Sequence, residues 1–257
     1  MIKNFNPSIE KIEPTRDCVF LFLGMGKISK PSAKTLELFT VALKIFRKQI
    51  DPKGIIKEIS NPEFKKVYAG SGKNEADAPL GKIYPKAEHL ALYIFTLGEK
   101  ISQSISSLFA SRDFALGSML DAIASRSADM ASGIAEQKFF HFLESDYRIR
   151  SSTTMLLYSP GYCGWHISAQ KRLFEYLEPE EIGITLSQQF LMVPLKSITG
   201  VLVAGKRDIH IFKNNFSFCR LCSHKSCLQR IKPLIQEDKE IKHGNIKSNL
   251  TASTDGR

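Results

Sequence analysis

Three cysteines near the C-terminus have the spacing of a metal-binding cluster. Cys219, Cys222 and Cys227 form a C-x2-C-x4-C pattern in a chain of 257 residues with only five cysteines. Two thiolates three residues apart can bind one ion, and a third thiolate nearby fills another corner of a tetrahedron. The pattern leaves zinc, an iron–sulfur cluster and free thiols open. The fourth ligand must come from elsewhere, and the candidates are Cys163, Cys18 and His224.

A second group of residues that could do chemistry begins at a tight turn, Ser159-Pro160-Gly161-Tyr162. Proline fixes one backbone angle and glycine frees the next, so the backbone can approach a ligand closely. Cys163 and the only tryptophan, Trp165, follow directly. His166 comes next, and an imidazole there could bind a metal or relay a proton. A half-exposed structural histidine is the alternative.

The turn, the helix after it and a later apolar segment together resemble the C-terminal reactivation domain of cobalamin-dependent methionine synthase. The matching pieces are P-G-Y at 160–162, I-G-I-x-L at 182–186 and M-x-P-x-x-S-I-T-G at 192–200, and the resemblance is strongest over Tyr158–Gly205. It implies a free-standing relative of that domain. The residues that it implies in binding S-adenosylmethionine or cobalamin are Tyr158, Pro160, Gly161, Tyr162, Glu136, Met192, Pro194, Ser197 and Gly200. For the last four, packing within a sheet is the alternative.

One position departs from the family pattern R-x-x-P-G-Y, in which the arginine pairs with the carboxylate of the ligand. This chain has Leu157 at that position. A guanidinium group binds a carboxylate through two parallel hydrogen bonds, and leucine cannot replace it. Arg148 and Arg150 are the nearest candidates to supply the charge.

The resemblance implies reactivation of an oxidised cobalamin by re-reduction and methylation. The cobalamin would be held by a corrinoid protein, or by a methionine synthase that lacks its own reactivation domain. If the chain is an enzyme, it is then a methyltransferase component, and a reductase is a further candidate partner. The need for a low-potential electron favours an iron–sulfur cluster over zinc. The alternative is a non-catalytic docking module for a corrinoid protein, with a structural zinc or iron–sulfur clasp.

Composition narrows the choice of partners. The formal net charge of +10 favours an acidic partner, and a lysine-rich surface chosen for solubility is the alternative. The lysines are scattered and not interleaved with aromatic residues, which argues against a nucleic-acid surface. A zinc-containing nucleic-acid-binding protein is therefore the weakest of three hypotheses. We find no apolar run long enough to span a membrane and no signal peptide, so we expect a cytoplasmic protein.

The hydrophobic pattern predicts an α+β fold, with an antiparallel or mixed twisted sheet packed with several long helices. The expected strands are Cys18–Leu23, Ile55–Ile59, Lys65–Ala69, Arg150–Tyr158, a strand or hairpin across Gln189–Gly205, and Ile209–Phe212. The expected helices are one capped by Ser32 or Ser29 and ending near Gln49, Ala87–Phe109, Asp113–Leu143 and Ser168–Leu177.

We expect four parts along the chain. Residues 1–16 form a surface arm, and 17–218 form the activation-domain-like α+β domain. The cysteine cluster occupies 219–230. Residues 231–257 form a polar tail, which we expect to be disordered from about Lys242.

Overall fold

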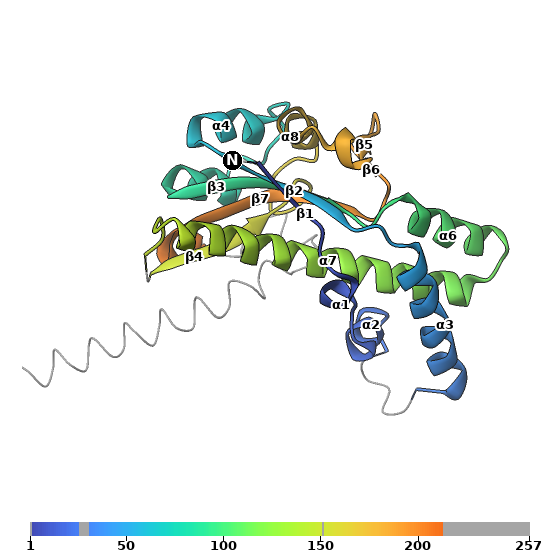
Figure 1. Ribbon diagram of the computed structural model, residues 1–257. Coiled ribbons are helices and arrows are strands. Elements are labelled where there is room, and N and C mark those ends of the chain that lie inside the picture. Colours follow the sequence, from blue (N-terminus) through green and yellow to red (C-terminus); the bar gives the residue numbers. More distant parts are fainter. Residues whose placement is uncertain (1, 26–30, 151, 213–257) are drawn as a thin grey trace, which may run out of the picture.

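A five-stranded antiparallel sheet is the centre of the molecule (Figure 1). The computed structural model describes residues 2–25, 31–150 and 152–212. The strand order is β1-β2-β3-β7-β4, so β4 lies at one edge beside the long β7. The strands are β1 (Ile2–Phe5), β2 (Lys53–Ile59), β3 (His89–Thr96), β4 (Thr153–Tyr158) and β7 (Ser197–Lys206), and a separate small ribbon pairs β5 (Thr185–Leu186) with β6 (Met192–Val193). The expected α+β architecture with an antiparallel sheet is confirmed.

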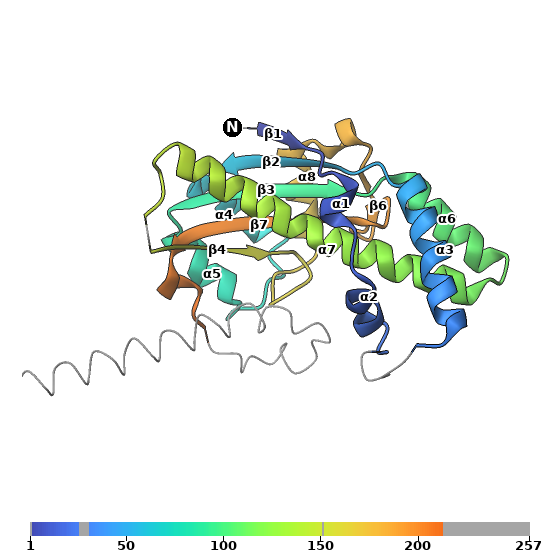
Figure 2. The same ribbon diagram turned by 60° about the horizontal axis from the view of Figure 1, so that its bottom comes forward.

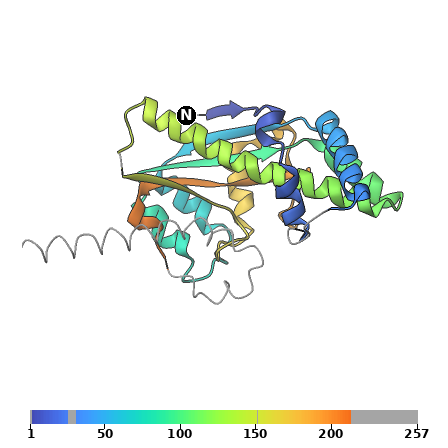
Figure 3. The same ribbon diagram turned by 90° about the horizontal axis from the view of Figure 1, so that it is seen from below.

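One face of the sheet is covered by α7 (Phe114–Ser145), a long helix that runs along this face (Figures 1 and 3). The buried side of α7 carries small side chains, including Ala124, Ala128, Ala131 and Ala135, which let the helix pack close to its neighbours. Beyond the sheet, α7 continues among further helices (Figure 2). The helices packed with it on this face are α1 (Ile9–Ile12), α2 (Arg16–Phe22), α3 (Ala33–Gln49) and α6 (Glu99–Ala110).

The opposite face is covered by α4 (Asn61–Ala69), α5 (Pro79–Ile83) and α8 (Ala169–Leu177). The two faces bury separate apolar cores, and the central strand β3 contributes to both. Its alternate residues Ala91, Tyr93 and Phe95 face α7, whereas Leu90, Leu92 and Ile94 face α4 and α8. Three short 3₁₀ turns complete the described chain, η1 (Tyr84–Lys86), η2 (Pro179–Ile182) and η3 (Arg207–His210).

Several helix and strand predictions are confirmed. The helix that begins after Ser32 is α3, and the Ser32 hydroxyl accepts a hydrogen bond from the backbone N–H of Thr35. The long helix that follows Asp113 is α7, with the Asp113 carboxylate as its cap. The predictions near Ile55–Ile59, Arg150–Tyr158, Ser168–Leu177 and Gln189–Gly205 correspond to β2, β4, α8 and β6 with β7.

The predicted helix over Ala87–Phe109 is wrong, because its first half is the strand β3. A strand buried on both faces is apolar at every position, so its sequence has no alternation that would distinguish it from a helix. Gly98 separates strand from helix. Its φ of 87° lies in the left-handed region, and α6 begins at the next residue.

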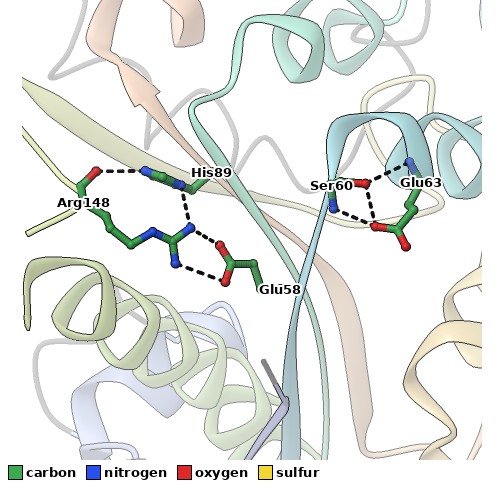
Figure 4. Close-up of polar contacts among 5 residues, drawn as sticks. All are labelled: Glu58, Ser60, Glu63, His89 and Arg148. Carbon is green, nitrogen blue, oxygen red and sulfur yellow. Dashed lines mark hydrogen bonds and ion pairs between the residues drawn. The ribbon is translucent and has the colours of Figure 1, made fainter. Parts of the chain in front are cut away.

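Three predicted strands are also wrong. Residues 18–22 lie in α2 and Leu23 is its C-cap, and Thr15 caps the start of the helix by accepting a hydrogen bond from the Cys18 N–H. Lys65–Ala69 lies in α4, which begins with a capping box between Ser60 and Glu63 (Figure 4). Ile209 and His210 lie in the 3₁₀ turn η3, and Ile211 and Phe212 follow it without forming a strand.

The N-terminal segment is part of the packed core rather than a surface arm. β1 pairs with β2, and the side chains of Phe5 and Ile12 are 3% and 0% exposed. The predicted cysteine cluster at 219–230 and the predicted disordered tail lie outside the described residues.

Candidate functional site

The turn at 159–165 is a compact loop that leaves the edge strand β4. The Gly161 N–H donates to the carbonyl of Trp165 at 2.7 Å, and the Trp165 N–H donates to the carbonyl of Tyr162 at 3.0 Å. Gly161, Cys163 and Gly164 all have positive φ, of 89°, 52° and 75°. The loop therefore closes on itself through its own backbone, and glycine at two of these positions avoids most of the strain.

Gly200 on β7 lets this loop come close to the sheet. An ideal Cβ at Gly200 would lie 2.3 Å from the carbonyl oxygen of Tyr158 and 2.9 Å from Ser159 Oγ. Real carbon–oxygen contacts are about 1 Å longer, so a side chain at this position would displace the end of β4. The two residues directly before P-G-Y thus lie against Gly200, the last residue of the M-x-P-x-x-S-I-T-G segment.

The other residues of the second segment lie mostly inside the structure. Ser197 is 7% exposed, and its hydroxyl donates to the carbonyl of Pro194 at 2.7 Å and lies 2.9 Å from Thr96 Oγ1. Pro194 is buried, and Met192 is half-buried against the core under α8. Pro194, Ser197 and Gly200 are thus packed within the structure, as the alternative to ligand binding predicted. Of these four residues, only Met192 is partly accessible to solvent.

A segment between α4 and α5 holds the turn from the other side, and sequence reasoning missed it. Asn74 donates through Nδ2 to the carbonyl of Tyr68 at 2.6 Å, and its Oδ1 accepts the N–H of His166 at 2.9 Å. The Glu75 N–H donates to the carbonyl of Gly164 at 2.9 Å. Ser71 and Ser168 join hydroxyl to hydroxyl at 2.6 Å. The only signal was a glycine- and serine-rich turn, which does not indicate where in space it lies.

The aromatic and histidine side chains around the turn differ in accessibility. Tyr162 is 43% exposed at the tip of the loop, whereas Tyr158 is 6% exposed and lies 3.3 Å from Nδ1 of the buried His210. Burial lowers the pKa of His210 to about 4, so it is neutral at pH 7. His166 uses Nδ1 to accept the N–H of Ser168 at 3.2 Å, which places its proton on Nε2. Of these residues, Tyr162 is the best placed to contact a ligand.

Glu136 and Leu157 lie on the α7 side of the sheet. Glu136 is half-buried on α7, and Leu157 is 5% exposed within the core that α7 covers. Because neighbouring residues of a strand face opposite ways, Tyr158 belongs to the other core. His166, which is bound to Asn74 and Ser168, is likewise held by the segments of that other face.

Neither candidate arginine replaces the missing charge beside the turn. The guanidinium of Arg148 pairs with both oxygens of Glu58 and donates to His89 Nδ1, while His89 Nε2 donates to the Arg148 carbonyl (Figure 4). The Arg148 side chain lowers the pKa of Glu58 through this hydrogen bond. Arg148 and Arg150 both precede β4, whereas the turn follows its far end.

The cysteines of the described chain are separate from one another. Cys163 is half-buried in the turn, and Cys18 lies on α2, where its Sγ accepts a hydrogen bond from Arg126 Nε at 3.3 Å. Residues 2–25, 31–150 and 152–212 contain no group of three or more metal-ligating side chains. Cys219, Cys222, Cys227 and His224 lie outside these ranges.

A family model and a solved structure match this chain. A sequence model of the family "Vitamin B12 dependent methionine synthase, activation domain" matches residues 82–213, which is just over half of the chain. Among solved structures, the crystal structure of the MetH reactivation domain bound to AdoHcy matches with a TM-score of 0.55 at 15% identity. The match covers 91% of this chain and 90% of that one. No curated protein sequence matches. No described helix is long and apolar enough to cross a membrane.

Proposed function

The chain belongs to the family of vitamin B12-dependent methionine synthase activation domains, and from this premise we propose that it binds S-adenosylmethionine at the 159–165 turn and reactivates the cobalamin of a separate corrinoid protein. The observation that carries the proposal is the close approach of Tyr158 and Ser159, the residues directly before P-G-Y, to Gly200 of the second motif segment. The solved relative was crystallised with AdoHcy, the product of methyl transfer from S-adenosylmethionine, which supports this choice of ligand.

The chemistry of such a site needs orientation more than acid or base catalysis. A methyl group on a sulfonium is transferred by in-line displacement, and the cobalt of the partner's reduced cobalamin supplies the electron pair. Rate then comes from holding donor and acceptor in line and excluding water. The turn fits this role because its backbone is fixed by internal hydrogen bonds and Tyr162 is presented at its tip. We assign Tyr162, Gly161 and Pro160 to ligand binding. The family resemblance also implies Glu136 and Met192, of which Glu136 lies on the α7 side of the sheet.

Leu157 gives the rival proposal its specific support. Its side chain is buried in the α7-facing core, so it offers nothing to the carboxylate of S-adenosylmethionine. In this second reading the chain keeps the fold and docks on a corrinoid protein, or on a methionine synthase without its own reactivation domain, but transfers no methyl group. The net charge of +10 favours an acidic partner surface under either proposal.

Titration calorimetry with S-adenosylmethionine separates the two proposals. We expect the wild-type protein to bind S-adenosylmethionine with measurable heat. Tyr162→Ala is the matched loss-of-contact variant, since Tyr162 is exposed and its removal leaves the core intact. Absence of heat with wild type would rule out the methyl-transfer proposal and favour the docking module.

A bound metal is the remaining part of the proposal. Three closely spaced cysteines, Cys219, Cys222 and Cys227, provide thiolates, and Cys163 in the turn is the fourth ligand that we propose. Cys163 lies half-buried in the turn. An iron–sulfur cluster would supply the electron for cobalt reduction, alone or with a reductase, whereas zinc would be structural. Iron, sulfide and zinc analysis of anaerobically purified protein, with Cys163→Ala beside Cys18→Ala as control, decides between them.

A further inference from the structure

We propose that Asn74 is a positioning residue, which holds the 159–165 turn in one conformation and thereby sets its affinity for a ligand. The inference rests on the proposed function only in naming S-adenosylmethionine as that ligand. Asn74 lies in the loop between α4 and α5, about 90 residues before the turn in the chain. Nothing in its sequence surroundings connects it with the P-G-Y motif.

The amide of Asn74 joins two backbones through a donor and an acceptor. Nδ2 donates to the carbonyl of Tyr68 at 2.6 Å, in the last turn of α4, and Oδ1 accepts the N–H of His166 at 2.9 Å. These two bonds also settle which end of the amide is nitrogen, because the Tyr68 carbonyl can only accept and the His166 N–H can only donate. The turn is therefore fastened to the end of a packed helix rather than only to its own flanking segments.

Two further contacts come from the same segment, and both act on the residues after Tyr162. The Glu75 N–H donates to the carbonyl of Gly164, and the Ser71 hydroxyl meets Ser168. Gly70 makes the close approach possible, because its φ is 51° and a Cβ there would lie 3.2 Å from the backbone of Ala169. Of the four residues in this segment, Asn74 is the one whose side chain bonds to two backbones, those of Tyr68 and His166. We therefore expect Asn74 to contribute most to the orientation of the turn.

The turn has internal hydrogen bonds and contacts with other elements, and only the second kind can orient it. This explains why a positioning residue such as Asn74 is needed. The internal bonds, from Gly161 to Trp165 and from Trp165 to Tyr162, keep the loop compact. They do not determine its orientation relative to the sheet. Trp165 anchors one side by packing among Phe64 and Tyr68, with ring centroids 5.8 and 6.1 Å away. Asn74 fixes the backbone directly after this anchor, and an oriented turn loses less entropy when a ligand binds.

Hydrogen exchange and calorimetry on the full chain test the inference, with Asn74→Leu as the main variant. We expect the amides of Gly161 and His166 to exchange about tenfold faster or more, and S-adenosylmethionine to bind about tenfold more weakly. Asn61→Leu is the matched control, because Asn61 lies at the other end of α4 and donates one hydrogen bond, to the Ala87 carbonyl at 3.2 Å. That variant should leave exchange in the turn and ligand affinity unchanged.

Asn74→Asp provides a second variant that keeps the shape and the acceptor for the His166 N–H but loses the donor to Tyr68. The exchange rate of the His166 amide in Asn74→Asp should lie between the rates in wild type and in Asn74→Leu. If Asn74→Leu does not fold, Asn74→Asp is compared with wild type alone and should exchange faster at His166. Unchanged exchange in the turn of Asn74→Leu and of Asn74→Asp would overturn the inference. If wild type gives no heat with S-adenosylmethionine, the ligand proposal fails, while exchange still decides the role of Asn74.

Discussion

Replacing Gly200 by alanine should destabilise the protein strongly, because the new methyl group has no space. Its Cβ would lie 2.3 Å from the carbonyl oxygen of Tyr158, where a normal contact is about 3.3 Å. The obstacle is the backbone of a paired strand, so it cannot rotate away as a side-chain end would. Overpacking in a well-packed region costs about 1–3 kcal/mol, and we expect about 3 kcal/mol for this case. The melting temperature should fall by about 5–10 °C.

Urea unfolding followed by tryptophan fluorescence measures this effect directly. Trp165 is the only tryptophan and is 1% exposed, so its emission changes when the surroundings of the turn unfold. Gly133→Ala is the matched control, since a Cβ at Gly133 meets nothing within 4 Å. Gly133 lies inside α7, where alanine is favoured over glycine by about 1 kcal/mol. The same substitution should thus stabilise one site and destabilise the other.

Two results would refute this reasoning. If Gly200→Ala unfolds at the same urea concentration as wild type, the close approach of β4 to β7 is not required for stability. If Gly133→Ala is as destabilising as Gly200→Ala, the effect comes from alanine in general rather than from the contact with Tyr158.

Three other predictions concern charges and helix capping. Burial lowers the pKa of His210 from 6.5 to about 4. Between these pH values the unfolded chain binds more protons than the folded protein. The free energy of unfolding should therefore fall by about 3 kcal/mol as the pH drops from 6.5 to 4. His210→Gln should reduce that slope in urea unfolding at a series of pH values. Removing one partner of the partly buried Arg148–Glu58 pair should cost about 1 kcal/mol, and a double-mutant cycle with Arg148→Gln and Glu58→Gln should show coupling. Ser60→Ala removes the side-chain cap of α4 and should lower the unfolding free energy by about 1 kcal/mol, measured in the same assay.

Local sequence signals were sufficient wherever one short segment decides its own structure. Ser32 and Asp113 cap the helices that were predicted to follow them. The capping pair Ser60 and Glu63 was also present in the sequence and identifies α4, but we predicted a strand at Lys65–Ala69 instead. Finding this capping pair requires no tertiary information.

The strand β3 could not be distinguished from a helix by local pattern. Its residues from Leu90 to Thr96 are all buried, because one set faces α7 and the other faces α4 and α8. Apolar residues at every position satisfy the spacing of a helix as well as that of a strand. Only the assembly of a layer on each face of the sheet determines which structure forms.

By itself, the sequence determined the family, the α+β architecture and the turn at 159–165, because each depends on residue types at short spacing. Tertiary structure alone decided how these residues are used. It buried Leu157 and Tyr158 in opposite cores, since β4 alternates between faces, and it paired Arg148 with Glu58 far from the turn. It also brought Asn74 to His166 across 92 positions of the chain, a contact that no local pattern encodes.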